Sequence, residues 1–114
     1  MGRRRQFDSA TALDAAVQCF WHRGYEATSV RDLAASMGIC GTSLYNAFGD
    51  KRALFTHALE HYLDETVRER IVRLEHSLPP KDAIRKFIDE IIARSLSDPD
   101  RRGCFLINSA LEAA

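Results

Sequence analysis

The sequence lacks long hydrophobic runs and has few cysteines. No apolar stretch approaches the roughly 18 residues that span a membrane. Its three cysteines, Cys19, Cys40 and Cys104, are odd in number and irregularly spaced, which argues against a disulfide framework, and they contain no C-x-x-C metal pair. The basic start of the chain is not followed by the apolar segment of a signal peptide. We therefore expect a cytoplasmic chain with reduced thiols and no membrane partner.

An excess of charge of one sign is also missing. The 114 residues include 16 Lys and Arg and 16 Asp and Glu, so the formal net charge is zero. Basic residues are in slight excess over residues 1–52 and acidic residues over 53–114. This asymmetry fits a DNA-facing head on an acidic body. The composition, 46% hydrophobic and 28% charged, is that of a folded globular chain.

Alternation of the β-strand type is absent, and apolar residues recur instead at helical spacing. The spacing predicts helices from residue 8 or 9 to 23, and over about 29–37, 42–48, 51–75, 80–97, with a last one starting near 103 or 104. Ser29 followed by Asp32 is a capping-box pattern, and Gly24 and Gly38 are expected to end the first two helices. The fold class is therefore all-α.

The two longest predicted helices have the largest inward-facing sets. For the helix 51–75 the set is Leu54, Ala58, Leu59, Tyr62, Val67, Ile71 and Leu74. For the helix 80–97 it is Ile84, Phe87, Ile88, Ile91 and Ile92. The chain stops inside a helical pattern, so we expect a truncated bundle after the first helices.

The central feature is a helix, a tight turn containing Gly38 and Gly41, and a second short helix. Two helices joined in this way meet at a wide angle, and the second can lie in the major groove of DNA. The same arrangement also occurs as plain structure, so the geometry alone leaves both interpretations open.

The residues of this feature favour DNA binding. The stretch GYEATSVRDLAASMGI at 24–39, continued by SLYNAFGDKRALF at 43–55, closely resembles the signature of the tetracycline-repressor (TetR/AcrR) family. The similarity begins near Phe7, and a weaker likeness continues at RGCFLIN, 102–108. The resemblance implies a homodimeric repressor without a cofactor. Its first three helices would bind a double-stranded DNA operator, and the others would form a small-molecule effector pocket and a dimer interface.

The resemblance also implies site residues. Thr28 and Ser29, which open the second helix, would contact DNA. The free backbone N–H groups at Ser29 and Val30 favour a phosphate there, and Arg31 would reach guanine or phosphate. The remaining positions lie in or beside the third helix. They are Thr42, Ser43, Tyr45 and Asn46, which would approach phosphate or base edges, and Lys51, which would contact phosphate.

The sequence departs from the family pattern at three positions. Gly41 and Ala47 stand where members often have side chains that contact DNA, and Cys40 replaces a common Ser or Thr. Specificity is then expected to rest on Arg31, on Thr42 and Asn46, and on DNA shape.

Arg3, Arg4 and Arg5 precede the first helix. They form either a basic arm that enters the minor groove or contacts phosphates, or a solvated terminus.

A competing function comes from His57, Glu60 and His61, which spell H-x-x-E-H, a zinc-hydrolase pattern. On a helix the two histidines share a face, but no clear third ligand follows. A solvated polar face is the plainer interpretation, so we predict no enzyme and no metal. A helical protein-interaction module without DNA binding is a further alternative.

A second competing role concerns Cys40. It stands at the start of the predicted recognition helix, where the helix dipole favours a reactive thiolate. A small residue tolerated in a turn is the plainer interpretation.

We predict two domains, a DNA-binding head at 1–50 and the start of a helical regulatory domain at 51–114. Candidate effector-binding residues are Tyr62, Phe87, Ile91 and Phe105, for which bundle core is the commoner role. The predicted function is sequence-specific transcriptional regulation, as a repressor released by a small effector.

Overall fold

The protein is described by a computed structural model covering residues 8–113, in which every regular element is a helix. The predicted all-α class is thus confirmed. The chain divides into two compact units, the first ending at Tyr62 and the second beginning at Leu63. The expected functional boundary after residue 50 falls at the end of the third helix of the first unit. No helix within 8–113 is long and apolar enough to cross a membrane.

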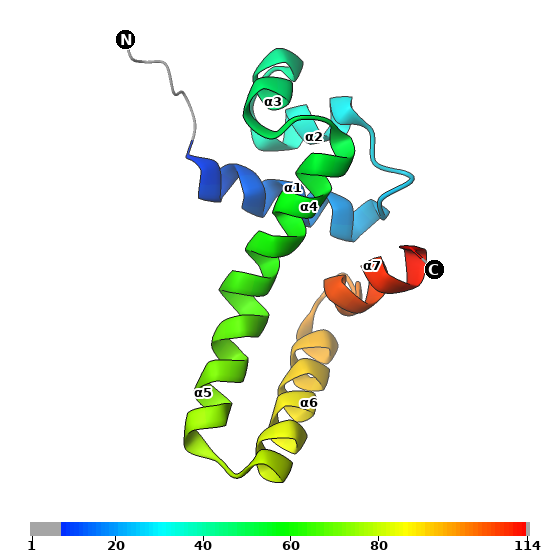
Figure 1. Cartoon of the computed structure of the whole chain (residues 1–114). Helices are drawn as coiled ribbons and strands as arrows, with labels where there is room; N and C mark the ends of the chain where they lie inside the picture. The colour runs from blue at the N-terminus through cyan, green and yellow to red at the C-terminus, as the bar shows by residue number, and fades with distance from the viewer. Residues whose placement is uncertain (1–7, 114) are drawn as a thin grey trace. The chain divides into compact units, whose positions relative to one another are not determined.

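The described part of the first unit, residues 8–62, contains four helices: α1 (Ser9–Arg23), α2 (Val30–Met37), α3 (Gly41–Phe48) and α4 (Lys51–Tyr62). α2 and α4 both pack on α1, as Figure 1 shows. Each helix contributes a side chain with almost no exposed surface: Phe20, Leu33, Leu44 and Leu54. These side chains form one apolar core, and their burial holds the short helices α2 and α3 in place.

Local signals set the start of α1 and both ends of α2 where the sequence predicts them. The carboxylate of Asp8 accepts a hydrogen bond from the N–H of Ala10 at 3.3 Å and caps α1. The capping box of α2 is present: the N–H of Asp32 donates to the Ser29 hydroxyl at 3.0 Å, and the N–H of Ser29 donates to the Asp32 carboxylate at 3.1 Å. Gly38 ends α2 in the left-handed conformation, with φ of 72°.

Contacts between aromatic rings pack α4 against α1 and against the turn that follows α1. The ring of Phe55 lies edge-on to those of Phe20 and Tyr25, with 5.0 Å between centroids in each pair. Further along α4, the ring of Tyr62 lies 5.7 Å from that of Trp21. Edge-on rings add to the energy of area burial, so α4 is firmly part of this unit.

The second unit contains η1 (Leu63–Arg68), α5 (Glu69–Ser77), α6 (Pro80–Ser97) and α7 (Phe105–Ala113). Residues 51–77 are all helical, as the helix predicted over about 51–75 requires, but within them η1 has the wider turns of a π-helix, which the sequence did not predict. Periodicity over a few residues does not distinguish 3.6 residues per turn from slightly more.

α5 and α6 lie side by side and are joined by Leu78 and Pro79 (Figure 1). Glu90 of α6 accepts hydrogen bonds from Arg73 of α5, the shorter at 2.7 Å, and pairs with Arg70 at 3.1 Å. These cations lower the pKa of Glu90, the Arg73 hydrogen bond being the main cause.

The predicted inward face of α6 is partly wrong. Ile84, Ile88 and Ile92 are at least half exposed, whereas the half-buried residues of α6 are Ala83, Phe87, Glu90, Ile91 and Ser95. Ile71 of α5, also predicted inward, is 46% exposed. Apolar periodicity identifies a helix face that favours burial but does not identify the element that covers it.

Candidate nucleic-acid interface

The helix-turn-helix consists of α2, the turn 38–40 and α3. The N–H of Ile39 donates to the Ala34 carbonyl at 3.1 Å, and the N–H of Gly38 donates to Ala35 at 3.3 Å. This pair of bonds is a Schellman motif, which ends α2 and sets the direction in which the chain enters α3. The predicted turn is therefore present, with α3 beginning at Gly41, one residue earlier than expected.

α3 has one buried and one exposed face. Leu44 and Phe48 are buried in the core of the unit, while Thr42, Asn46 and Ala47 are exposed and Tyr45 is 52% exposed. Within residues 8–113, no side chain forms a hydrogen bond or ion pair with the side chains of Thr42, Tyr45 or Asn46. α3 thus presents three polar groups that are available to an external partner.

The start of α3 has no side-chain cap. Cys40 occupies the N-cap position without capping the backbone, and its Sγ lies 3.3 Å from the Oγ of Ser43. The hydroxyl of Ser43, followed by the N–H groups of Ser43 and Thr42, lowers the pKa of the exposed Cys40 thiol. These first N–H groups are the ones that a helix N-terminus offers to an anion.

The start of α2 is polar and tightly bonded. Hydrogen bonds from the N–H and hydroxyl of Ser29 lower the pKa of Asp32, and the guanidinium of Arg23, 3.3 Å away, adds to the effect. Arg31, which precedes Asp32, is exposed and also lowers the pKa of Asp32, but it forms no hydrogen bond or ion pair within the described residues. Its guanidinium is therefore available for a phosphate or a base.

Thr28, one of the predicted contact residues, has a different position. Its side chain is 1% exposed, and its hydroxyl donates to the carbonyl of Gly24 at 2.6 Å. This bond closes the loop between α1 and α2. A hydroxyl in this position is not accessible to DNA, so the side chain of Thr28 does not make the contact that was predicted at this position.

Lys51 begins α4 beside this surface. Its Nζ lies 4.3 Å from the centroid of the Tyr25 ring, within cation–π range. The carboxylate of Asp50 accepts a hydrogen bond from the N–H of Ala53 at 2.8 Å and caps α4. The ammonium group of Lys51 therefore lies near the N-terminus of α4, where its charge adds to the positive end of the helix dipole.

The H-x-x-E-H residues do not converge on a metal site. The ring of His57 packs against that of Phe48, 5.9 Å between centroids, and Nε2 of His61 lies 2.6 Å from a carboxylate oxygen of Asp14. In the part of the chain that the structure describes, no group of three or more His, Cys, Asp or Glu is placed to hold a metal. Arg3, Arg4 and Arg5 lie outside the described residues.

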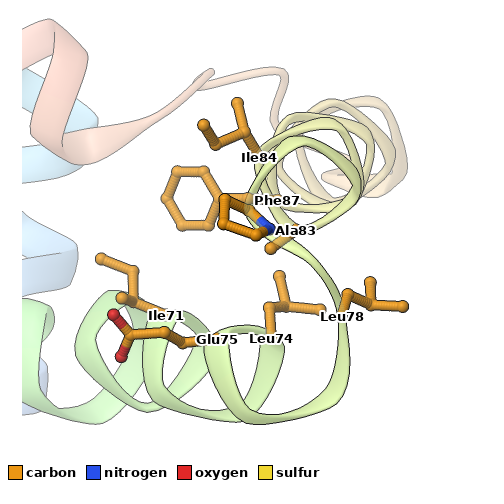
Figure 2. Close-up of a pocket in the computed structure, with 8 residues that line it drawn as sticks. Ile71, Leu74, Glu75, Leu78, Ala83, Ile84 and Phe87 are labelled. Carbon is orange, nitrogen blue, oxygen red and sulfur yellow. The ribbon is translucent and has the colours of Figure 1, made fainter.

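The second unit has an open apolar groove of about 430 Å³ at the turn between α5 and α6 (Figure 2). Its lining is Ile71, Leu74, Glu75, Leu78, Pro80, Ala83, Ile84 and Phe87.

Only one of the four predicted effector residues, Phe87, lines this groove. Tyr62 is buried in the first unit. Phe105 is buried and Ile91 half-buried without lining the groove.

The capped α2, the Schellman turn and the exposed polar face of α3 define a helix-turn-helix protein of the DNA-binding class. Residues 12–58 match the family described as bacterial regulatory proteins, tetR family. The chain belongs to this family, as the resemblance predicts, and the family is not one of enzymes.

Individual relatives agree with this assignment. The chain is 42% identical over 113 residues to the uncharacterized HTH-type transcriptional regulator YezE of Bacillus subtilis, covering 98% of this chain and 58% of YezE. It is 35% identical to the HTH-type transcriptional repressor ComR of Escherichia coli, covering 95% of this chain and 52% of ComR.

A solved structure gives the same fold. The TetR family transcriptional regulator CifR, as a cysteine mutant complexed with 26-bp double-strand operator DNA, superposes with a TM-score of 0.84 at 41% identity. The match covers 96% of this chain and 57% of the CifR chain. This chain therefore spans little more than half the length of the relatives that it matches.

Proposed function

We propose that this chain is the DNA-binding head and the first part of the regulatory domain of a sequence-specific transcriptional repressor. The observation that carries the proposal is the exposed face of α3, where Thr42, Tyr45 and Asn46 present polar groups without a partner in residues 8–113. The chain is similar in fold and in sequence to CifR, at a TM-score of 0.84 and 41% identity, and the CifR structure is a complex with operator DNA.

Each predicted contact has a physical basis. α3 lies in the major groove, where Thr42, Tyr45 and Asn46 approach base edges and Ser43 stands near the phosphates. Arg31 binds guanine or phosphate from α2, and Lys51 binds phosphate from α4. Ser29 caps α2, and the N–H groups that follow it at the start of the helix bind a phosphate of the DNA backbone.

The regulatory part of the proposal concerns the second unit. A small molecule that occupies the apolar groove beside Phe87 releases the repressor from its operator. The whole protein acts in the cytoplasm. It is a homodimer, because two heads related by a two-fold axis match a palindromic operator. The proposed boundary after residue 50 separates the helix-turn-helix from the helices that lead to the regulatory part, with Lys51 at the start of α4 still contributing to DNA binding.

The test is retention of duplex DNA from a random pool, with selection for enriched sites. Wild-type chain is compared with the double variant Tyr45→Ala, Lys51→Ala, and enrichment of a palindromic or half-palindromic site only with wild type is expected. The matched control is Lys86→Ala, Ile88→Ala, which removes a cation and an exposed apolar side chain from α6.

The outcomes separate the candidate functions. Equal retention by wild type and the double variant would overturn the assigned interface. No retention at low salt by wild type, with the fold intact by circular dichroism, would favour a protein-interaction module that does not bind DNA.

A further inference from the structure

The recognition helix of this chain carries no charge. Residues 33–49, which include the end of α2, the turn and the whole of α3, contain no Asp, Glu, Lys, Arg or His. The nearest cations of the surface are Arg31 on α2 and Lys51 on α4. Any bases that α3 touches are therefore read by neutral groups.

This neutrality limits the bases that α3 can read. Guanine presents two acceptors, N7 and O6, in the major groove, and proteins read this pair most often with the cationic donors of Arg or Lys. α3 has neither residue. A carboxylate that could accept from the N4 amino group of cytosine is also absent from α3.

The exposed side chains of α3 fit the other base pair. The Asn46 amide is exposed and has both a donor and an acceptor, the combination that pairs with N6 and N7 of adenine. The Ala47 methyl group is exposed beside it, and a methyl group is the apolar partner of the C5-methyl of thymine. Thr42 lies one turn before Asn46 on the same face and offers both a hydroxyl and a methyl group.

Gly41 adds to this argument. It lies in the first turn of α3 without a side chain, and a Cβ built there meets no atom within 4 Å. Position 41 therefore has no side chain that could bind guanine, although a side chain there would not clash with the protein.

We infer that the base pairs contacted by α3 are A·T pairs, with the Asn46 amide bonded to adenine and the Ala47 methyl group against the thymine methyl group. Guanine, where the operator contains it, is read by Arg31 at the edge of the site. This inference rests on the proposed DNA binding.

The test is selection of enriched sites from random duplex DNA with wild type, Asn46→Arg and Gly41→Arg. Wild type enriches A·T pairs at the positions facing α3, and replacing one of them by G·C weakens binding about tenfold or more. Asn46→Arg changes the preference at one position of each half-site from A·T to G·C. Gly41→Arg adds a G·C preference at a neighbouring position and leaves the Asn46 position unchanged.

The thymine contact has its own test, substitution of uracil for thymine, which removes only the C5-methyl group. Wild type binds the uracil duplex several-fold more weakly than the thymine duplex. Ala47→Gly binds both duplexes equally, and the ratio within one variant cancels any effect of glycine on helix stability.

Failure of the inference is distinguishable from failure of the proposed function. If enriched sites appear but have G·C pairs that Asn46→Arg does not change, α3 does not read A·T, and DNA binding still holds. If wild type enriches no site at any salt concentration, both the proposed function and this inference are overturned.

Discussion

The Nζ of Lys51 lies 4.3 Å from the centroid of the Tyr25 ring, so an aromatic residue of the α1–α2 turn positions the cation that begins α4. The contact links two segments that are 26 positions apart in the sequence. A cation held over a ring keeps its charge and loses part of its freedom, which favours a contact with a fixed phosphate.

Replacing Tyr25 by Leu tests this relationship. A cation–π contact at an exposed site is worth about 0.5–1 kcal/mol, so Tyr25→Leu is expected to weaken binding to an enriched duplex about two- to five-fold. Tyr25→Phe keeps the ring and should retain the affinity. Binding measured by fluorescence anisotropy checks both, at a temperature where each variant is folded. Equal DNA affinities for the Leu and Phe variants would mean that the Tyr25 ring does not contribute to DNA binding.

Cys40→Ser should stabilise the first unit. A Ser at the N-cap accepts a hydrogen bond from the first turn, which Cys40 does not, and such caps contribute about 0.5–2 kcal/mol. Urea unfolding followed by the fluorescence of Trp21, which lies in this unit, measures the change. Cys40→Ala is the control and should give no gain. A lower midpoint for the Ser variant would mean that the contact between Cys40 and Ser43 matters more than the cap.

Thr28→Val should destabilise the same unit. The substitution keeps the volume but removes the hydroxyl that donates to the Gly24 carbonyl, leaving a part-buried acceptor without this bond. The expected cost is about 1–3 kcal/mol, measured by urea unfolding, and Thr28→Ser should recover most of it. At a temperature where Thr28→Val is folded, its DNA affinity should match that of wild type. A large loss of affinity without loss of stability would restore Thr28 as a contact residue.

Asp98 predicts a pH dependence in the second unit. Hydrogen bonds from the Arg102 guanidinium and N–H, and from the N–H of Asp100, lower the pKa of Asp98 to about 2. Because the folded-state pKa lies below the unfolded value, the contribution to stability is present above about pH 4 and is lost as the pH falls towards 2. An NMR titration of the Asp98 carboxyl carbon gives its pKa directly.

Asp98→Asn provides the comparison for this pH effect. The variant should unfold at a lower temperature at neutral pH, and the difference from wild type should shrink as the pH falls below 4. A difference that stays constant from pH 7 to pH 2 would contradict the assigned ion pair.

The sequence predicted the features that depend on neighbouring residues. The Ser29–Asp32 capping box and the glycine ends of α1 and α2 are local chemistry, and the structure has them where they were expected. The helix-turn-helix followed from the same signals together with the family resemblance.

Contacts between distant residues could not be predicted in this way. Asp14 and His61 are 47 positions apart, and nothing local indicates that they meet. The burial of Thr28 depends on how the loop packs, and the exposure of Ile84 depends on which element covers α6. In the site, the exposed face of α3 follows from periodicity, but the position of Lys51 over Tyr25 does not.

The salt dependence of DNA binding tests the central claim most directly. The logarithm of the binding constant for an enriched duplex should fall linearly with the logarithm of salt concentration. The slope should be smaller in magnitude by about one for Lys51→Ala, because one phosphate contact is lost. Lys86→Ala, on the second unit, should leave the slope unchanged. If this slope of the binding constant against salt is the same in wild type and in Lys51→Ala, the result contradicts a DNA interface formed by α2, α3 and the start of α4.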